Sequence, residues 1–245
     1  MVKNDALLLE KIKGKTAKIA ILGLGYVGLP LAVRFAEAGF SVIGIDVDEA
    51  KVDQIRKGIS PVEGVALKGS VAKAIRCSAD FSLLQSADAA VICVPTPLSK
   101  TRDPDLSFVL EAARVVASHL QPGKLVVLES TTYPGTTREL LLPVLEETGL
   151  KVGNGFFLGY SPERIDPGNQ SFGLVNTPKV VAGVTKTCLK LIKALYGQIV
   201  DQVVPVSSTD SAETVKLLEN VFRSVNVGLV NEFTIMCHRL GLDVW

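Results

Sequence analysis

The chain has 245 residues, of which 47% are hydrophobic and 21% charged, and its formal net charge at pH 7 is +1. Such a composition is typical of a globular protein, and a chain of this length buries roughly 70% of its unfolded surface. The near-neutral charge argues against nucleic acid or an anionic membrane as the main partner. The apolar runs are shorter than the roughly 20 residues that a membrane span needs.

Residues 1–18 carry acids and several lysines without an apolar core, so they do not resemble a secretory signal. We expect residues 1–16 to form a short leading helix. Four cysteines lie among apolar residues without CxxC spacing, namely Cys77, Cys93, Cys188 and Cys237. Buried, reduced thiols in a cytoplasmic protein are expected, with neither disulfides nor a metal site.

The most informative stretch is KIAILGLGYVGLPLAVRFAEAGFSVIGIDVD, at residues 18–48. An apolar run leads into a glycine turn and a helical segment over 26–38, and a second apolar run over 41–45 ends at Asp46. Strand, glycine turn, helix, strand and acid stand in the order of a dinucleotide-binding βαβ unit.

Each glycine of the turn has a physical role. Gly23 allows the strand to turn tightly, and Gly25, which lacks a Cβ, lets a pyrophosphate approach the backbone. Gly28 allows the helix to pack closely on the strand. The amides and dipole at the helix start then favour the anionic pyrophosphate. Tyr26 and Val27 lie in the same turn and belong to the expected cofactor contacts.

Asp46 stands at the end of the second predicted strand, where its carboxylate can accept hydrogen bonds from both ribose hydroxyls. Such a charge-assisted bond contributes about 1.5–3 kcal/mol. A 2′-phosphate would meet like charge from Asp46 and Asp48. The sequence therefore favours NAD over NADP, and FAD, which shares the fingerprint, stays as a minor alternative.

The α/β alternation continues beyond this unit. We expect helices over 49–58, 81–86, 106–120, 136–147 and 185–196, and strands over 87–94, 124–129, 155–160, 179–184 and 202–206. Residues 59–70 are expected to form a loop. Residues 17–206 are thus predicted to be a Rossmann-type, doubly wound domain with a mainly parallel sheet, parallel strands joined by helices, and ligand loops at the strands' carboxyl ends.

The pattern changes at residues 207–245, where one helix is predicted over 209–240. Its length would be about 48 Å at 1.5 Å per residue. Apolar residues fall on several of its faces, and such a helix must be covered by other elements. We expect this segment to begin a central helical domain whose covering elements are missing or come from another chain.

Four polar groups of residues stand at predicted strand ends or on one helix face. They are Pro95-Thr96-Pro97, Thr131 with its neighbours, Ser161-Pro162-Glu163-Arg164, and the stripe of Lys216, Asn220 and Arg223. Taken singly, each has an ordinary explanation, because prolines punctuate loops, hydroxyls cap helices and charges are often merely solvated.

Taken together, four segments resemble one family. They are VPTP at 94–97, ESTTYPGTT at 129–137, YSPERIDPGN at 160–169 and ETVKLLENVFRSVNVGLVNE at 213–232. The resemblance is to the nucleotide-sugar 6-dehydrogenases of the UDP-glucose/GDP-mannose dehydrogenase superfamily, nearest to the branch that uses UDP-N-acetylglucosamine or UDP-N-acetylmannosamine. It covers nearly the whole chain.

The resemblance implies oxidation of a UDP-sugar at C6 from alcohol to acid with two NAD⁺, in a homodimer formed through the 209–240 helix. The expected cofactor contacts are Gly23, Gly25, Tyr26, Val27, Gly28, Asp46, Pro95, Thr96 and Thr131. The expected substrate contacts are Glu163, Arg164, Lys216, Asn220 and Arg223. No metal is implied.

The resemblance also implies catalytic roles for Lys216, Glu163, Asn220 and Thr131. Lys216 would stabilise negative charge on the C6 oxygen, as a preorganised ammonium can, and a lysine whose pKa burial lowers can also act as a base. Glu163 would assist hydrolysis of a covalent intermediate, and Asn220 would orient a water or a substrate hydroxyl. Thr131 would lie near the nicotinamide.

One feature of the family is missing from the sequence. The family's nucleophile is a cysteine in a GxC-x-P context beyond the central helix, and residue 245 comes before any such motif. We therefore expect the chain to be the N-terminal part of such an enzyme, without the C-terminal nucleotide-sugar-binding domain. Alone, it would bind NAD and would not complete turnover, because the thioester step needs a thiolate at C6.

Two other functions stay open from the sequence. One is an NAD-binding module without catalysis, such as a sensor or partner subunit. The other is a two-electron dehydrogenase of the β-hydroxyacid type, which shares the Rossmann domain, the long helix and a lysine–asparagine pair four residues apart. The ESTTYPGTT and SPERIDPGN loops, with Glu163, argue against the second.

Overall fold

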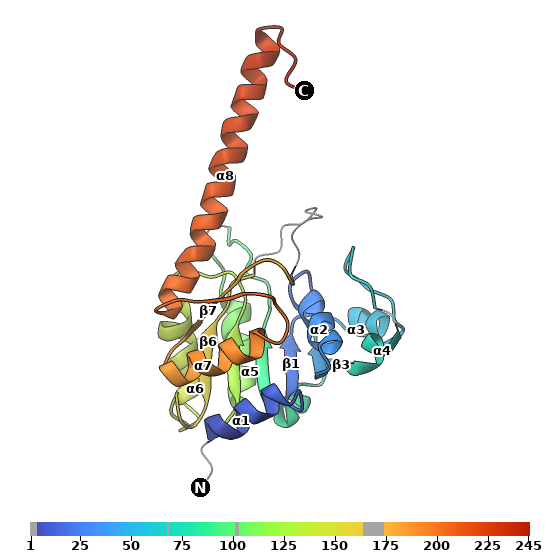
Figure 1. Ribbon diagram of the computed structural model, residues 1–245, viewed down its shortest axis with the longest axis vertical. Helices are drawn as coiled ribbons and strands as arrows, with labels where there is room; N and C mark the ends of the chain where they lie inside the picture. The colour runs from blue at the N-terminus through green and yellow to red at the C-terminus, as the bar shows by residue number, and fades with distance from the viewer. Residues whose placement is uncertain (1–3, 68, 101–102, 164–173) are drawn as a thin grey trace.

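The computed structural model describes residues 4–67, 69–100, 103–163 and 174–245, and within them eight strands form one sheet (Figure 1). The strand order is β3-β2-β1-β4-β5-β6-β7-β8. The strands are β1 (Lys18–Leu22), β2 (Ser41–Ile45), β3 (Ile75–Ser78), β4 (Ala89–Ile92), β5 (Leu125–Leu128), β6 (Phe157–Tyr160), β7 (Lys179–Gly183) and β8 (Val203–Pro205). This order confirms the predicted doubly wound sheet.

The sheet is mainly parallel, as predicted, because β1 to β6 pair in parallel. The exception to the expected parallel topology is β7, which pairs antiparallel with β6 at Gly159↔Gly183 and Tyr160↔Ala182. β8 is parallel to β7. An antiparallel neighbour needs no crossover helix. The antiparallel direction of β7 matters for the site, because it makes β7 start at the edge of the sheet where β4, β5 and β6 end.

Helices cover both faces of the sheet, which explains why most strand residues are buried. The first face packs on α1 (Asn4–Lys13), α2 (Gly28–Glu37), α3 (Glu49–Arg56) and α7 (Lys186–Tyr196). The second packs on α5 (Ser107–Ser118), α6 (Leu142–Glu146) and the start of α8 (Thr209–Arg239). Alternate residues of β1 feed the two layers: Ile19 and Ile21 face one, Ala20 and Leu22 the other.

Two segments differ from the sequence-based expectation. The helix α4 (Gly69–Ala74) begins inside the segment 59–70 that we predicted as a loop, and the edge strand β3, which was not predicted, follows it. The predicted helix over 136–147 is instead a π-helix, η2 (Thr136–Leu141), followed by the short α6. Pro143 in α6 has no amide proton to continue an α-helical ladder, which accounts for the break. The predicted 81–86 helix forms as the 3₁₀ helix η1 (Phe81–Ser86).

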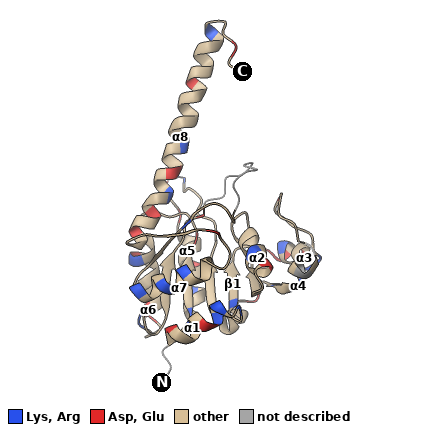
Figure 2. Ribbon diagram, viewed as in Figure 1, with Lys and Arg blue, Asp and Glu red and all other residues tan. Residues whose placement is uncertain are grey.

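The long predicted helix forms as α8, 31 residues that project from the sheet (Figure 1). Its buried residues lie at its start, and much of its remaining length is apolar and exposed. Exposed apolar side chains include Leu218, Val221, Phe222, Val225 and Leu229. Charged residues are sparse along this length (Figure 2). No helix in the described part of the chain is long and apolar enough to cross a membrane.

All four cysteines are free thiols, and three are buried as predicted. Cys237 is the exception. It lies on the projecting part of α8 and is only half-buried, because no other described element covers that part.

Candidate functional site

The glycine turn after β1 has the geometry that the sequence predicts. Gly23 adopts φ +90°, and a Cβ there would meet the Cys93 carbonyl oxygen at 2.8 Å. A Cβ on Gly28 would lie 1.8 Å from the Gly23 carbonyl oxygen, so only glycine allows α2 to start there. A Cβ on Gly25 would meet no atom within 4 Å. Gly25 therefore borders open space, which fits a pyrophosphate held against bare backbone.

Helix α2 starts directly after this turn without a side-chain cap. Val27 is the N-cap residue and makes no side-chain cap hydrogen bond. Amides at a helix start carry partial positive charge and bind anions. Tyr26 is 77% exposed beside them. The residues present thus fit NAD.

Asp46 is buried, with only 8% of its surface exposed. One carboxylate oxygen accepts from the Leu24 amide at 2.8 Å and the other from the Asp48 amide at 2.9 Å. Lys51 Nζ lies 3.9 Å from Asp46 Oδ2. Asp46 therefore holds the glycine turn itself. Each oxygen has a second lone pair, so its predicted bond to a ribose stays a prediction.

Thr96 and Thr131 follow β4 and β5, two adjacent parallel strands, and both are half-buried. Pro95 beside Thr96 is exposed. The Ser130 hydroxyl donates to the Val94 carbonyl oxygen at 2.6 Å and ties the two strand ends together. Parallel strands end at one edge of a sheet, where α/β proteins bind their ligands.

The structure joins two predicted catalytic residues from distant segments. Lys216 Nζ on α8 donates to the backbone carbonyl oxygen of Glu163, which follows β6, at 2.5 Å. Burial lowers the pKa of Lys216, and the nearby Glu163 and Glu219 carboxylates partly oppose that shift. Glu163 itself is buried. The structure thus brings Lys216 to the loop of Glu163 through the Glu163 backbone, and the catalytic roles of both residues stay predictions.

Asn220 and Arg223 continue the stripe that begins at Lys216 and are exposed. A hollow of about 430 Å³ runs along α8 beside them. Its lining residues are Lys216, Glu219, Asn220, Phe222, Arg223, Asn226 and Val227. Arg164, also a predicted substrate contact, lies outside the described residues.

Sequence reasoning missed a buried ionic cluster beneath Glu163. Lys179 Nζ, at the start of β7, donates to Glu129 Oε2 at 2.9 Å and to the Pro162 carbonyl oxygen at 3.1 Å, and lies 4.0 Å from Glu163 Oε2. The Tyr196 hydroxyl donates to Glu129, and Lys179 sits 5.3 Å from the centre of the Tyr196 ring.

Lys179 is 2% exposed and Glu129 is fully buried. Burial alone would lower the pKa of Lys179, but Glu129 and Glu163 outweigh it and raise that pKa. The ammonium therefore stays charged and supports the 161–163 loop from below. One signal was available in the sequence: a charged residue adjoining an all-apolar strand requires a buried partner. Within the described residues, no group of His, Cys, Asp or Glu could hold a metal ion.

Comparisons with known proteins give consistent matches. Residues 17–200 match the NAD binding domain of the UDP-glucose/GDP-mannose dehydrogenase family, and residues 210–245 match its central domain. The chain is 38% identical over 232 residues to the UDP-N-acetyl-D-glucosamine 6-dehydrogenase of Pseudomonas aeruginosa, covering 94% of this chain and 55% of that protein.

Two matches come from Pyrococcus horikoshii. Its UDP-N-acetyl-D-mannosamine dehydrogenase is 35% identical over 233 residues, covering 93% of this chain and 56% of that protein. A solved structure of UDP-D-ManNAc dehydrogenase from that organism superposes with a TM-score of 0.86 at 36% identity, covering 93% of this chain and 55% of that one. The chain thus spans about half the length of the relatives it matches.

Proposed function

Because the chain belongs to the UDP-glucose/GDP-mannose dehydrogenase family and carries that family's NAD-binding domain, we propose that it supplies the NAD-binding part of a UDP-sugar 6-dehydrogenase. The substrate is a UDP-(N-acetyl)hexosamine, whose C6 alcohol is oxidised to the uronic acid with two NAD⁺. The names of two relatives, a UDP-N-acetyl-D-glucosamine 6-dehydrogenase and a UDP-N-acetyl-D-mannosamine dehydrogenase, support this substrate class.

One observation carries the proposal: Lys216 Nζ reaches the backbone of Glu163 across 53 residues of sequence. The predicted base or electrostatic group on α8 thereby contacts the loop that carries the Glu163 carboxylate. A two-electron hydroxyacid dehydrogenase has no hydrolytic step and would not need Glu163.

The chain's own residues have separate roles in cofactor binding and in catalysis. The backbone at Gly25 and the start of α2 hold the pyrophosphate, and Asp46 disfavours a 2′-phosphate. NAD⁺, when bound, accepts a hydride from C6. Lys216 stabilises negative charge on the C6 oxygen, and its lowered pKa suits it to accept the hydroxyl proton.

The remaining predicted residues act beside Lys216. Glu163 assists hydrolysis as the proton acceptor for water, and Asn220, four residues from Lys216 on α8, orients a water or a substrate hydroxyl. Arg223 contacts the substrate. Thr131 and Thr96 follow the ends of β5 and β4, and their role is to contact the cofactor.

The proposal includes a homodimer through α8. Its exposed apolar residues favour a partner surface, because soluble monomers rarely expose a long apolar patch. Size-exclusion chromatography with light scattering tests this, and a monomer at micromolar concentration would contradict it.

The test of the reaction uses the protein expressed from its complete gene, incubated with NAD⁺ and each of UDP-N-acetylglucosamine, UDP-N-acetylmannosamine and UDP-glucose. NADH is followed by its absorbance and the sugar product by mass spectrometry. Two NADH per uronic acid are expected, and Lys216→Met should abolish both. One NADH per sugar, ending at a carbonyl, would favour the two-electron alternative. NAD⁺ binding without NADH formation would favour a non-catalytic module.

A further inference from the structure

Helix α8 is attached to the sheet by its first turns alone among the described contacts. Its buried residues are Thr209, Ala212 and Glu213, and the residues beyond them are half-buried or exposed. The helix carries Lys216 directly after this short buried segment. Few contacts therefore decide where the Lys216 ammonium stands.

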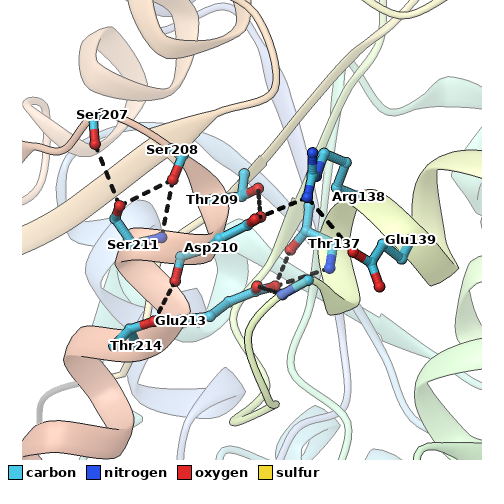
Figure 3. Close-up of polar contacts among 11 residues, drawn as sticks. Thr137, Arg138, Glu139, Ser207, Ser208, Thr209, Asp210, Ser211, Glu213 and Thr214 are labelled. Carbon is cyan, nitrogen blue, oxygen red and sulfur yellow. Dashed lines mark hydrogen bonds and ion pairs between the residues drawn. The ribbon is translucent and has the colours of Figure 1, made fainter.

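Glu213 makes several of these contacts (Figure 3), and its side chain is fully buried. One carboxylate oxygen accepts from the Thr137 amide at 2.8 Å and from the Thr137 hydroxyl at 2.7 Å. The other accepts from the Gly135 amide at 2.6 Å. Hydrogen bonds to a charged acceptor are the strong class. Three donors thus converge on one carboxylate.

Glu213 binds the segment that follows β5 and Thr131. Gly135 adopts φ +96°, a left-handed conformation that turns its amide toward the carboxylate, and η2 starts at the next residue. On α8, Glu213 and Lys216 are three residues apart and lie on adjoining turns of one face. The carboxylate therefore connects the Thr131 segment to the helix face that carries Lys216.

A neighbouring ion pair provides a contrast. Asp210 on α8 pairs with Arg138 of η2 at 3.0 Å, and both side chains are substantially exposed (Figure 3). Exposed pairs of this kind contribute little and are screened by salt. The two acids join the same two elements, so Asp210 is a matched control for Glu213.

We propose that Glu213 is a positioning residue, which fixes the height and rotation of α8 against the 135–137 turn and so sets the place of Lys216 relative to Thr131. A glutamine cannot replace it, because its single acceptor oxygen would leave an NH₂ facing an amide donor. The significance for catalysis rests on the proposed function of Lys216 and Thr131. The claim that Glu213 fixes the position of α8 does not depend on that function.

The experiment measures the position of α8 directly. Spin labels are placed at Glu232→Cys on α8 and Lys186→Cys on α7, both exposed, in a Cys237→Ser background. Double electron–electron resonance gives their distance distribution, with the labelled chain diluted into unlabelled chain so that only intramolecular pairs count. A single narrow distance is expected without further change.

Glu213→Gln should at least double the width of that distribution, and Asp210→Asn should leave it unchanged. Thr137→Val, which removes one donor from the opposite side, should broaden it to an intermediate extent and keeps the test valid if the glutamine variant fails to fold. An unchanged width in Glu213→Gln, or equal broadening in Asp210→Asn, would overturn the proposal.

Calorimetry with NAD⁺ on the unlabelled chain separates this inference from the proposed function. Failure to bind NAD⁺ would refute the proposed function, whereas the distances would still decide the role of Glu213. In the protein from the complete gene, Glu213→Gln should lower kcat at least tenfold with the KM for NAD⁺ nearly unchanged. A change in KM alone would count against positioning of Lys216.

Discussion

Replacing Lys179 with methionine should destabilise the protein far more than removal of an ordinary surface charge. The variant keeps the length and apolar stem of the side chain and removes only the ammonium. Glu129, fully buried, then loses its cation at 2.9 Å, and the Pro162 carbonyl oxygen loses a donor at 3.1 Å. Tyr196 remains as a neutral donor to Glu129.

The magnitude follows from leaving a buried carboxylate uncompensated, which costs about 3–5 kcal/mol. Since domains are stable by only about 5–15 kcal/mol, the variant would lose a large part of its stability. Glu129→Gln added to Lys179→Met removes the stranded charge. The double variant should therefore be at least about 2 kcal/mol more stable than the sum of the two single effects.

Urea unfolding followed by circular dichroism measures all four proteins of this cycle. With a slope of about 2–3 kcal/mol per molar urea, the Lys179→Met midpoint should fall by about 1–2.5 M. Lys186→Met, the same change at an exposed position of α7, is the control and should shift the midpoint little. A loss below about 1 kcal/mol for Lys179→Met, or strict additivity in the double variant, would refute the ion-pair argument.

Three further outcomes are expected. Gly28→Ala should lower the melting temperature markedly, because its Cβ would stand 1.8 Å from a backbone oxygen, and a normal melt would contradict the close packing of α2 on β1. Asp46→Asn should weaken NAD⁺ binding about 10- to 150-fold in calorimetry, the equivalent of one charge-assisted bond, and unchanged affinity would remove Asp46 from the cofactor site. Burial raises the pKa of Glu213 despite its three hydrogen bonds, so the folded state binds the proton more tightly than the unfolded state. The stability of the unmutated chain relative to Glu213→Gln should then fall as pH rises from about 4.5 through that raised pKa. Urea midpoints of both proteins across that pH range measure the difference in stability. A difference that stays constant or grows with pH would contradict the raised pKa.

The central part of the fold was predictable because its signals are local. Strand β1, the glycine turn, α2 and β2 follow one another without interruption, and each has its own composition and period. The edge strand β3 was missed because it is only four residues long, too short for its alternation of apolar and polar residues to stand out as a strand period. The reversed direction of β7 was missed because strand direction depends on pairing, which the periodicity of one segment does not encode.

The candidate site likewise has residues that were predicted from the sequence and residues that were missed. Lys216 was predicted as a site residue from its spacing to Asn220 and from the resemblance to the family, and the structure adds its contact with the Glu163 backbone. Glu129, Lys179 and Glu213 were missed because their role is to compensate one another or backbone donors across long separations. A sequence shows that a buried charge needs a partner. Only the fold shows which partner it has.

Calorimetric titration of NAD⁺ into the unmutated chain and into Gly25→Ala tests the central claim most directly. A methyl group at Gly25 touches nothing within 4 Å, so the variant should melt at the unmutated temperature and yet lose NAD⁺ affinity at least tenfold, because the methyl occupies the space of the pyrophosphate. NADP⁺ should bind neither protein. Equal NAD⁺ affinity in both proteins would mean that the pyrophosphate does not lie over the turn, and the account of this site would fail.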